Sequence, residues 1–126
     1  MKLRPDWERK AYEQERRATL TGRAQELFNN ARTRAKKRDH PFTITREWVV
    51  GALTSGHCAV TGLPFRWETR SPHAPSIDQI DPALGYTPEN TRLVVAIFNY
   101  AKNVWDDDTV LNFAHAYIQR SSANGP

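Results

Sequence analysis

The chain has 126 residues and a net charge of +4, which suits one domain with a modest hydrophobic core. Its single cysteine, Cys58, excludes an intrachain disulfide and indicates a reducing compartment. No apolar run approaches the roughly 18 residues that a membrane-spanning helix needs, and no signal peptide opens the chain, so we predict a cytoplasmic protein without a membrane partner.

The charge is unevenly distributed along the chain. Residues 1–46 contain 13 Lys and Arg against 6 Asp and Glu, whereas the remaining residues contain 5 against 8. This division suits a nucleic-acid enzyme, because a basic part can hold phosphate while an acidic part attracts a cation. A soluble helix with a solvated basic face is the alternative explanation.

The first third of the chain is predicted to be helical. Residues 1–19 form a charged helical arm, and Gly22 marks a break after it. An apolar stripe then repeats at helical spacing, and it consists of Leu20, Ala24, Leu27, Phe28, Ala31 and Ala35. The opposite face carries five cations that can contact DNA phosphates, or that merely favour the end of a surface helix: Arg32, Arg34, Lys36, Lys37 and Arg38.

The middle of the chain is predicted to hold one helix and two short strands. Thr45 is expected to cap a helix that runs to about residue 54 and ends at Ser55-Gly56. Residues 57–60 are predicted as the first strand, with Cys58 as a small buried residue. Residues 76–80 alternate between apolar and polar side chains and are predicted as the second strand.

Two further helices are predicted after a turn at residues 83–86. Thr87 and Pro88 have the chemistry of an N-cap and a first helical residue. The helix that follows is expected to bury Leu93, Ile97, Tyr100 and Val104. Residues 106–108 are three aspartates, which we expect to cap the last helix, at residues 109–120, rather than to bind a metal. Residues 121–126 are predicted to form a flexible tail.

The segment from Ser76 to Lys102, SIDQIDPALGYTPENTRLVVAIFNYAK, resembles the core of the HNH endonucleases. These nucleases are built on a ββα-metal unit, and phage-encoded members are common. The resemblance covers roughly residues 20–105. It implies an α+β fold that is mainly helical, with a ββα core at about residues 56–104. That core would lie in a single domain, residues 20–120, between N-terminal basic helices and a C-terminal helix.

The resemblance also implies a role for each matched residue. Asp78 and Asn99 would hold one divalent ion, Mg²⁺ or Mn²⁺, and Asn90 would steady the loop between them. Gln79 stands where the family has the histidine that activates water, and an amide cannot act as a base near neutral pH. The candidates to replace that base are Asp81, His57 and His73. With one cysteine, the structural zinc of many HNH proteins is not expected.

We therefore predict a metal-dependent HNH-like endonuclease that hydrolyses DNA phosphodiester bonds in the cytoplasm, the host cytoplasm for a phage protein. The predicted contacts with the DNA backbone are Arg32, Arg34, Lys36, Lys37, Arg38, Arg92 and Lys102. The alternative is a catalytically impaired HNH-fold protein that acts as a DNA-binding or assembly factor. A third hypothesis is an interaction module that uses exposed aromatic residues. The sequence does not predict an oligomeric state.

Overall fold

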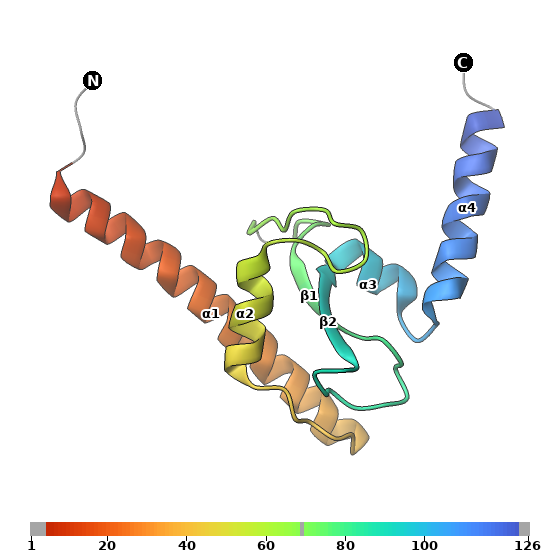
Figure 1. Ribbon diagram of the computed structural model, residues 1–126, viewed down its shortest axis with the longest axis horizontal. Coiled ribbons are helices and arrows are strands. Elements are labelled where there is room, and N and C mark those ends of the chain that lie inside the picture. Colours follow the sequence, from red (N-terminus) through yellow and green to blue (C-terminus); the bar gives the residue numbers. More distant parts are fainter. Residues whose placement is uncertain (1–4, 69, 124–126) are drawn as a thin grey trace.

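The computed structural model describes residues 5–68 and 70–123, with the backbone alone for residues 9–19. Its elements, in chain order, are α1 (Asp6–Arg38), α2 (Arg46–Ser55), β1 (Pro75–Gln79), β2 (Thr91–Val95), α3 (Ala96–Lys102) and α4 (Asp107–Ala123). The two strands lie at the centre, α2 lies beside α1, and α1 and α4 extend outward toward the two termini (Figure 1). The fold is therefore α+β and mainly helical, as predicted.

The helix α1 is unbroken, so the predicted break at Gly22 is wrong. Gly22 is exposed with open space around it, and one glycine costs a helix only about 1 kcal/mol. The predicted boundary between arm and domain therefore falls inside α1. The predicted apolar stripe is confirmed, because Ala24, Ala31 and Ala35 are all buried. Their small side chains let the backbone of α1 approach the core closely.

The helix α2 forms as predicted. The Thr45 hydroxyl accepts a hydrogen bond from the backbone N–H of Trp48 at 3.0 Å, which is N-cap geometry. Gly56 ends the helix at φ 80°, a conformation that glycine adopts without strain. Val49 and Leu53 are buried, so this helix belongs to the scaffold.

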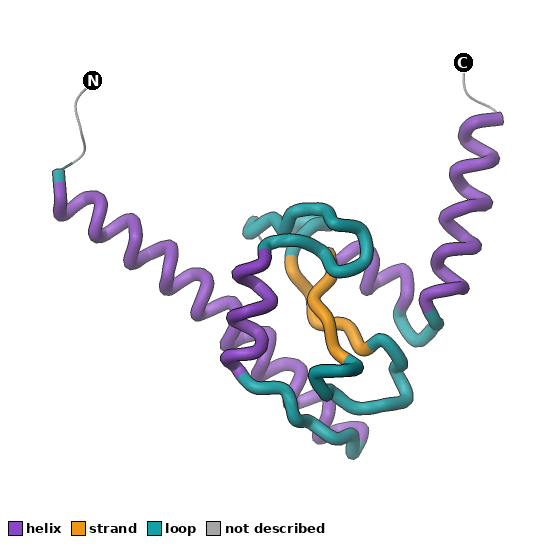
Figure 2. Tube along the Cα trace, in the orientation of Figure 1, coloured by secondary structure: helices purple, strands orange, loops and turns teal. Residues whose placement is uncertain are grey.

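The strand β1 is confirmed, but its partner differs from the prediction. β1 pairs antiparallel with β2, so that Ile77 lies opposite Leu93 and Asp78 opposite Arg92 (Figure 2). The predicted helix start at Thr87 and Pro88 is therefore wrong. Thr87 accepts a hydrogen bond from the backbone N–H of Asn90 at 3.2 Å and closes a turn instead. Helix geometry begins only at α3.

The predicted first strand at residues 57–60 is also wrong. The segment makes one isolated bridge, between His57 and Pro64. The Ala59 N–H donates to the carbonyl of Leu93 at 2.9 Å. Because β1 occupies one edge of β2, this contact places the segment on the other edge. Cys58 is buried, as predicted.

An aromatic cluster joins the end of α1 to the loop between the strands. Phe42 lies between Phe28 and Tyr86, with ring centroids 5.2 Å and 5.8 Å away. Backbone hydrogen bonds continue this contact: the Tyr86 N–H donates to the Pro41 carbonyl at 2.9 Å, and the Thr43 N–H donates to the Tyr86 carbonyl at 2.9 Å. A Cβ at Gly85 would collide with Pro41. The loop therefore needs glycine there in order to lie against the segment that follows α1.

The C-terminal part of the fold is less packed than predicted. Ile97, Tyr100 and Val104 are exposed rather than buried. Asp106 accepts hydrogen bonds from the N–H and hydroxyl of Thr109 at 2.9 Å and 2.7 Å, which confirms the predicted capping role. α4 continues through residues 121–123, where a flexible tail was predicted, and residues 124–126 lie outside the described residues. None of the described helices is long and apolar enough to cross a membrane.

Candidate functional site

A cavity of about 340 Å³ opens between the C-terminal part of α1, the strand β1 and the helix α3. Asp78 and Asn99, the predicted metal ligands, both line it, and so does Gln79. Arg34 and Arg38 line it from the basic helix. The fold thus brings five predicted site residues to one cavity. The other residues that line it are Ser76, Ile77, Pro82, Tyr86, Tyr100, Asn103 and Val104.

The Asp78 carboxylate is buried, and two cations hold it. Arg92, opposite it on β2, donates from Nε to Asp78 Oδ2 at 2.8 Å. The Nζ of Lys102, on α3, lies 3.1 Å from Oδ2 and 3.2 Å from Oδ1. A charge removed from water is tolerated when hydrogen-bonded partners of opposite charge replace the lost hydration. These two cations therefore stabilise the buried position of Asp78.

Lys102 is fully buried, with 0% of its surface exposed, so the predicted DNA contact by this residue is wrong. Its ammonium also donates to the backbone carbonyls of Gln79 at 2.6 Å and Ile80 at 2.9 Å. Three N–H donors are thus shared among two carbonyls and one carboxylate. Lys102 fastens the end of β1 to α3.

The guanidinium of Arg92 is also bonded to a second carboxylate. Its Nη2 donates to Asp107 Oδ1 at 2.7 Å, and the side chain is 16% exposed. Burial opposes the charge of Arg92, but its hydrogen bonds to Asp107 and Asp78 outweigh burial and raise its pKa. The hydrogen bond from Arg92 lowers the pKa of Asp107. The guanidinium therefore joins β2 to α4, and the DNA contact by Arg92 stays a prediction.

The donor atoms at the cavity are of the type that binds a divalent ion, but Asp78, one of the two donors, is bonded to cations of the protein. Asn99 donates through Nδ2 to the hydroxyl of Ser76 at 2.7 Å and the carbonyl of Ile77 at 3.0 Å. Its Oδ1 has no partner among the described residues, and a neutral oxygen of this kind suits Mg²⁺ or Mn²⁺. Asp78, in contrast, already has both oxygens bonded to cations. The described residues contain no cluster of three His, Cys, Asp or Glu that could hold a metal.

Gln79 occupies the position of the expected base. Its side chain is buried, and Nε2 donates to the backbone carbonyl of Leu84 at 2.6 Å. This bond fixes the amide against the loop that follows β1. Because an amide cannot take up a proton near neutral pH, Gln79 cannot deprotonate water.

The three candidates for a substitute base do not line the cavity. Asp81 is exposed, and its Oδ1 accepts a hydrogen bond from the Ala83 N–H at 3.0 Å. His57 lies at the far edge of β2, where its Nδ1 is 2.8 Å from the Ser55 carbonyl. His73 belongs to the loop before β1. None of the three side chains therefore belongs to the lining of the cavity, and their role as a base stays a prediction.

Asn90 makes the contacts expected of a residue that holds the loop between the strands. Its Oδ1 accepts from the Asp81 N–H at 2.9 Å. Its Nδ2 donates to the carbonyls of Asp81 at 3.1 Å and Gly85 at 2.8 Å. The side chain is buried, so it shapes the loop from within and does not reach the cavity.

The cavity also contains residues that were not predicted from the sequence as site residues. Tyr86 is buried, and its hydroxyl accepts a hydrogen bond from Arg34 Nε at 3.1 Å. Tyr100 lines the cavity from α3, although its helical spacing indicated a core position. Lys102 was predicted as a DNA contact. The only sequence signal that linked it to the site was its position three residues after Asn99, on the same helix.

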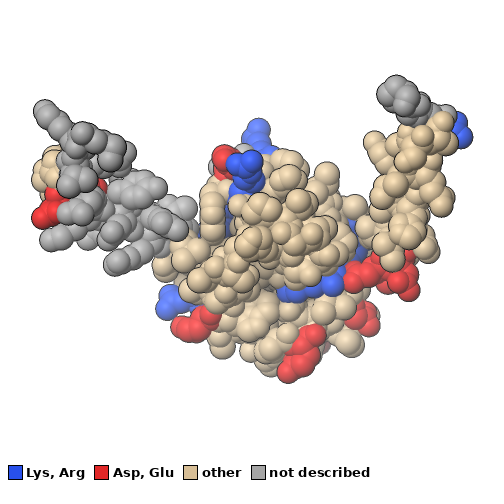
Figure 3. Space-filling model, turned by 45° about the horizontal axis from the view of Figure 1, so that its top comes forward, with Lys and Arg blue, Asp and Glu red and all other residues tan. Residues whose placement is uncertain are grey.

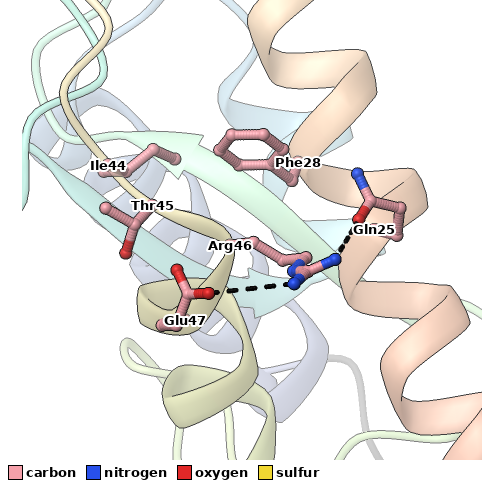
Figure 4. A pocket seen from close by; sticks show the side chains of 6 residues that line it. All are labelled: Gln25, Phe28, Ile44, Thr45, Arg46 and Glu47. Carbon is pink, nitrogen blue, oxygen red and sulfur yellow. Dashed lines mark hydrogen bonds and ion pairs between the residues drawn. The ribbon is translucent and has the colours of Figure 1, made fainter.

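A second hollow, of about 390 Å³, lies between α1 and the start of α2 (Figure 4). The figure shows Arg46 between Gln25 and Glu47, with hydrogen-bond and ion-pair distances of 3.0 Å and 3.9 Å. Its charged group is thus engaged by neighbouring side chains. This hollow contains none of the predicted site residues, so the cavity at Asp78 is the candidate functional site.

No protein-family model matches the sequence, and no curated protein sequence matches it. Among solved structures, the chain is similar to the rare-cutting HNH restriction endonuclease PacI, which was described in a study of DNA perturbation. The similarity has a TM-score of 0.56 and 22% sequence identity, and it covers 78% of each chain. The protein described here therefore has the fold of an HNH endonuclease.

Proposed function

We propose that this protein is a DNA endonuclease that acts in the cytoplasm and binds the scissile phosphodiester in the cavity at Asp78. One observation carries the proposal. A single cavity joins Asp78 and Asn99, from β1 and α3, to two arginines from the basic helix. The similarity in fold to an HNH restriction endonuclease supports DNA as the substrate.

Two arginines are suited to bind the phosphate. Arg38 is exposed and forms no ion pair or hydrogen bond through its side chain with the described residues. Arg34 uses Nε to bond Tyr86, which leaves its terminal nitrogens for a ligand. A guanidinium can bond two phosphate oxygens at once, so it both binds and orients the group. The exposed cations Arg32, Lys36 and Lys37 would extend the contact along the DNA backbone.

The proposed cofactor is one divalent ion, Mg²⁺ or Mn²⁺, with Asn99 and Asp78 as its proposed ligands. Such an ion would neutralise charge on the phosphate. Asp78 can serve as a ligand only if it gives up part of its contact with Arg92 or Lys102. We therefore expect ion binding in the absence of DNA to be weak.

Replacing Arg34 and Arg38 by glutamine should weaken DNA binding mainly at low salt. The slope of log K against log salt should fall by about 0.9 for each phosphate of duplex DNA that the variant no longer neutralises. Fluorescence anisotropy with a labelled duplex at several salt concentrations measures this slope. Arg46→Gln is the matched control, because it removes the same type of charge at the second hollow. An equal loss of affinity in the control would contradict a phosphate site at the cavity.

A plasmid-nicking assay tests the endonuclease activity. We expect slow nicking of supercoiled DNA with Mg²⁺ or Mn²⁺, none with EDTA, and none with Asp78→Asn. The Asn side chain keeps the shape of Asp78 and removes its charge. Circular dichroism and DNA binding verify that this variant folds. Unchanged nicking by a folded Asp78→Asn protein would remove Asp78 from the chemistry.

A second candidate function is DNA binding without hydrolysis. The specific observation in its favour is that Asp78 and Gln79 are both bonded inside the protein, to cations and to a carbonyl. This candidate predicts salt-sensitive DNA binding and no nicking with any metal. The two assays above therefore distinguish between the functions.

A further inference from the structure

The helix α4 exposes a large apolar surface that the rest of the described chain does not cover. None of its residues is buried. Phe113 is 67% exposed, Tyr117 66% and Ile118 60%. Figure 3 shows that the shaft of α4 carries almost no charged side chains between the acidic surface at its base and the basic side chain near its tip. An exposed apolar patch of this kind marks an interaction surface.

We propose that α4 is covered by α4 of a second copy of this chain, in an antiparallel dimer. The residues that carry the argument follow one another at steps of four, three, four and three, a spacing that keeps them on one side of a helix. They are Asp106, Val110, Phe113, Tyr117 and Arg120. The acidic residue thus begins the stripe, the basic residue ends it, and the residues between are apolar or aromatic.

The charges at the two ends select an antiparallel orientation. A two-fold axis near Phe113 brings Asp106 of one copy opposite Arg120 of the other, and the same pair forms again at the opposite end. In a parallel pair, like charges would meet at both ends. Arg120 has no ion-pair partner among the described residues. Asp106 uses only Oδ1 to cap Thr109, so Oδ2 remains available.

DNA is a poorer occupant of this surface than a second copy. The base of α4 carries three aspartates in a row, residues 106–108, which would repel phosphate. A helix of this length spans about 25 Å, and one helix pair covers less than the roughly 800 Å² per partner of a standard interface. We therefore expect a reversible dimer whose population rises with protein concentration.

Sedimentation velocity on the full chain, over a series of concentrations, tests the dimer. The unaltered protein should shift from one-chain to two-chain mass, and Phe113→Ser with Tyr117→Ser should remain at one-chain mass. Both positions are exposed, so the fold should survive, which circular dichroism verifies. Leu84→Ser is the matched control, because Leu84 is 56% exposed but lies in the loop between the strands. A one-chain mass for the unaltered protein at every concentration would overturn the proposal.

The orientation has its own test in Arg120→Gln. In the antiparallel dimer this change removes an attraction to Asp106 of the partner copy, so dimerisation should weaken and lose part of its salt dependence. In a parallel dimer it would relieve repulsion between two arginines and strengthen dimerisation. A stronger dimer would therefore overturn the antiparallel arrangement. Neither outcome depends on nuclease activity, so this proposal and the proposed function can fail separately.

Discussion

Gln79→His is expected to raise the rate of plasmid nicking by about 10²–10⁴-fold, the usual contribution of a positioned general base. The substitution would place an imidazole beside the cavity that Asp78 and Asn99 line. With an ordinary pKa near 6.5, it can accept a proton from water at neutral pH. The native amide cannot do so.

The surroundings of Gln79 favour a productive histidine. The carbonyl of Leu84, which now accepts from the Gln79 amide at 2.6 Å, can accept from one ring N–H of the new residue. That bond would fix the tautomer and leave the other ring nitrogen as the acceptor. No new charge would be buried, because the neutral ring is the active form.

The gain in nicking rate should require the neutral form of the new imidazole. Nicking by Gln79→His should fall as pH drops below the pKa of the new imidazole, and EDTA should abolish it. Gln79→Asn is the control, since it alters the same hydrogen bond without supplying a base. If Gln79→His folds and binds DNA but does not nick it faster, the missing base is not what limits the native chain. The non-hydrolytic DNA-binding function would then be favoured.

Lys102→Met should destabilise the protein strongly. It leaves the Asp78 carboxylate buried with Arg92 as its only cation, and it removes the donor from two backbone carbonyls. Breaking a buried ion pair from one side typically costs about 3–5 kcal/mol. For a chain of this size, that corresponds to a fall in Tm of roughly 10–20 °C.

Thermal and urea unfolding followed by circular dichroism measure this effect. Lys36→Met is the matched control, because Lys36 lies on the exposed side of α1 and should change Tm little. The double variant Lys102→Met with Asp78→Asn should recover part of the stability, since it no longer leaves a poorly compensated carboxylate. A Tm for Lys102→Met close to that of the unaltered chain would mean that the ion pair contributes little to stability.

Local signals in the sequence predicted the parts of the fold that depend on local chemistry. The apolar stripe of α1, the Thr45 cap and the strand β1 each follow from spacing or from one side chain, and the structure confirms them. The contacts of Asn90 with the loop also agree with the expectation from the family resemblance. These features can be predicted without knowing the tertiary contacts of the chain.

The errors arose where tertiary packing overrides local preference. Thr87 and Pro88 are typical of a helix start, yet the next residues form β2, in which Leu93, Val94 and Val95 are all buried. A strand buried on both faces shows no alternation, so it can be mistaken for part of a helix. The partners of Asp78 could not be predicted either. The register of β1 against β2 places Arg92 opposite Asp78, and the position of α3 beside β1 brings Lys102 to the same carboxylate.

The unbroken course of α1 also has a geometric consequence. Its 33 residues form a rod about 50 Å long at the rise of an α-helix. One end carries Arg34 and Arg38 into the cavity, and the other projects from the body (Figure 1). The first turns of α1 and the two arginines that line the cavity therefore belong to one continuous helix.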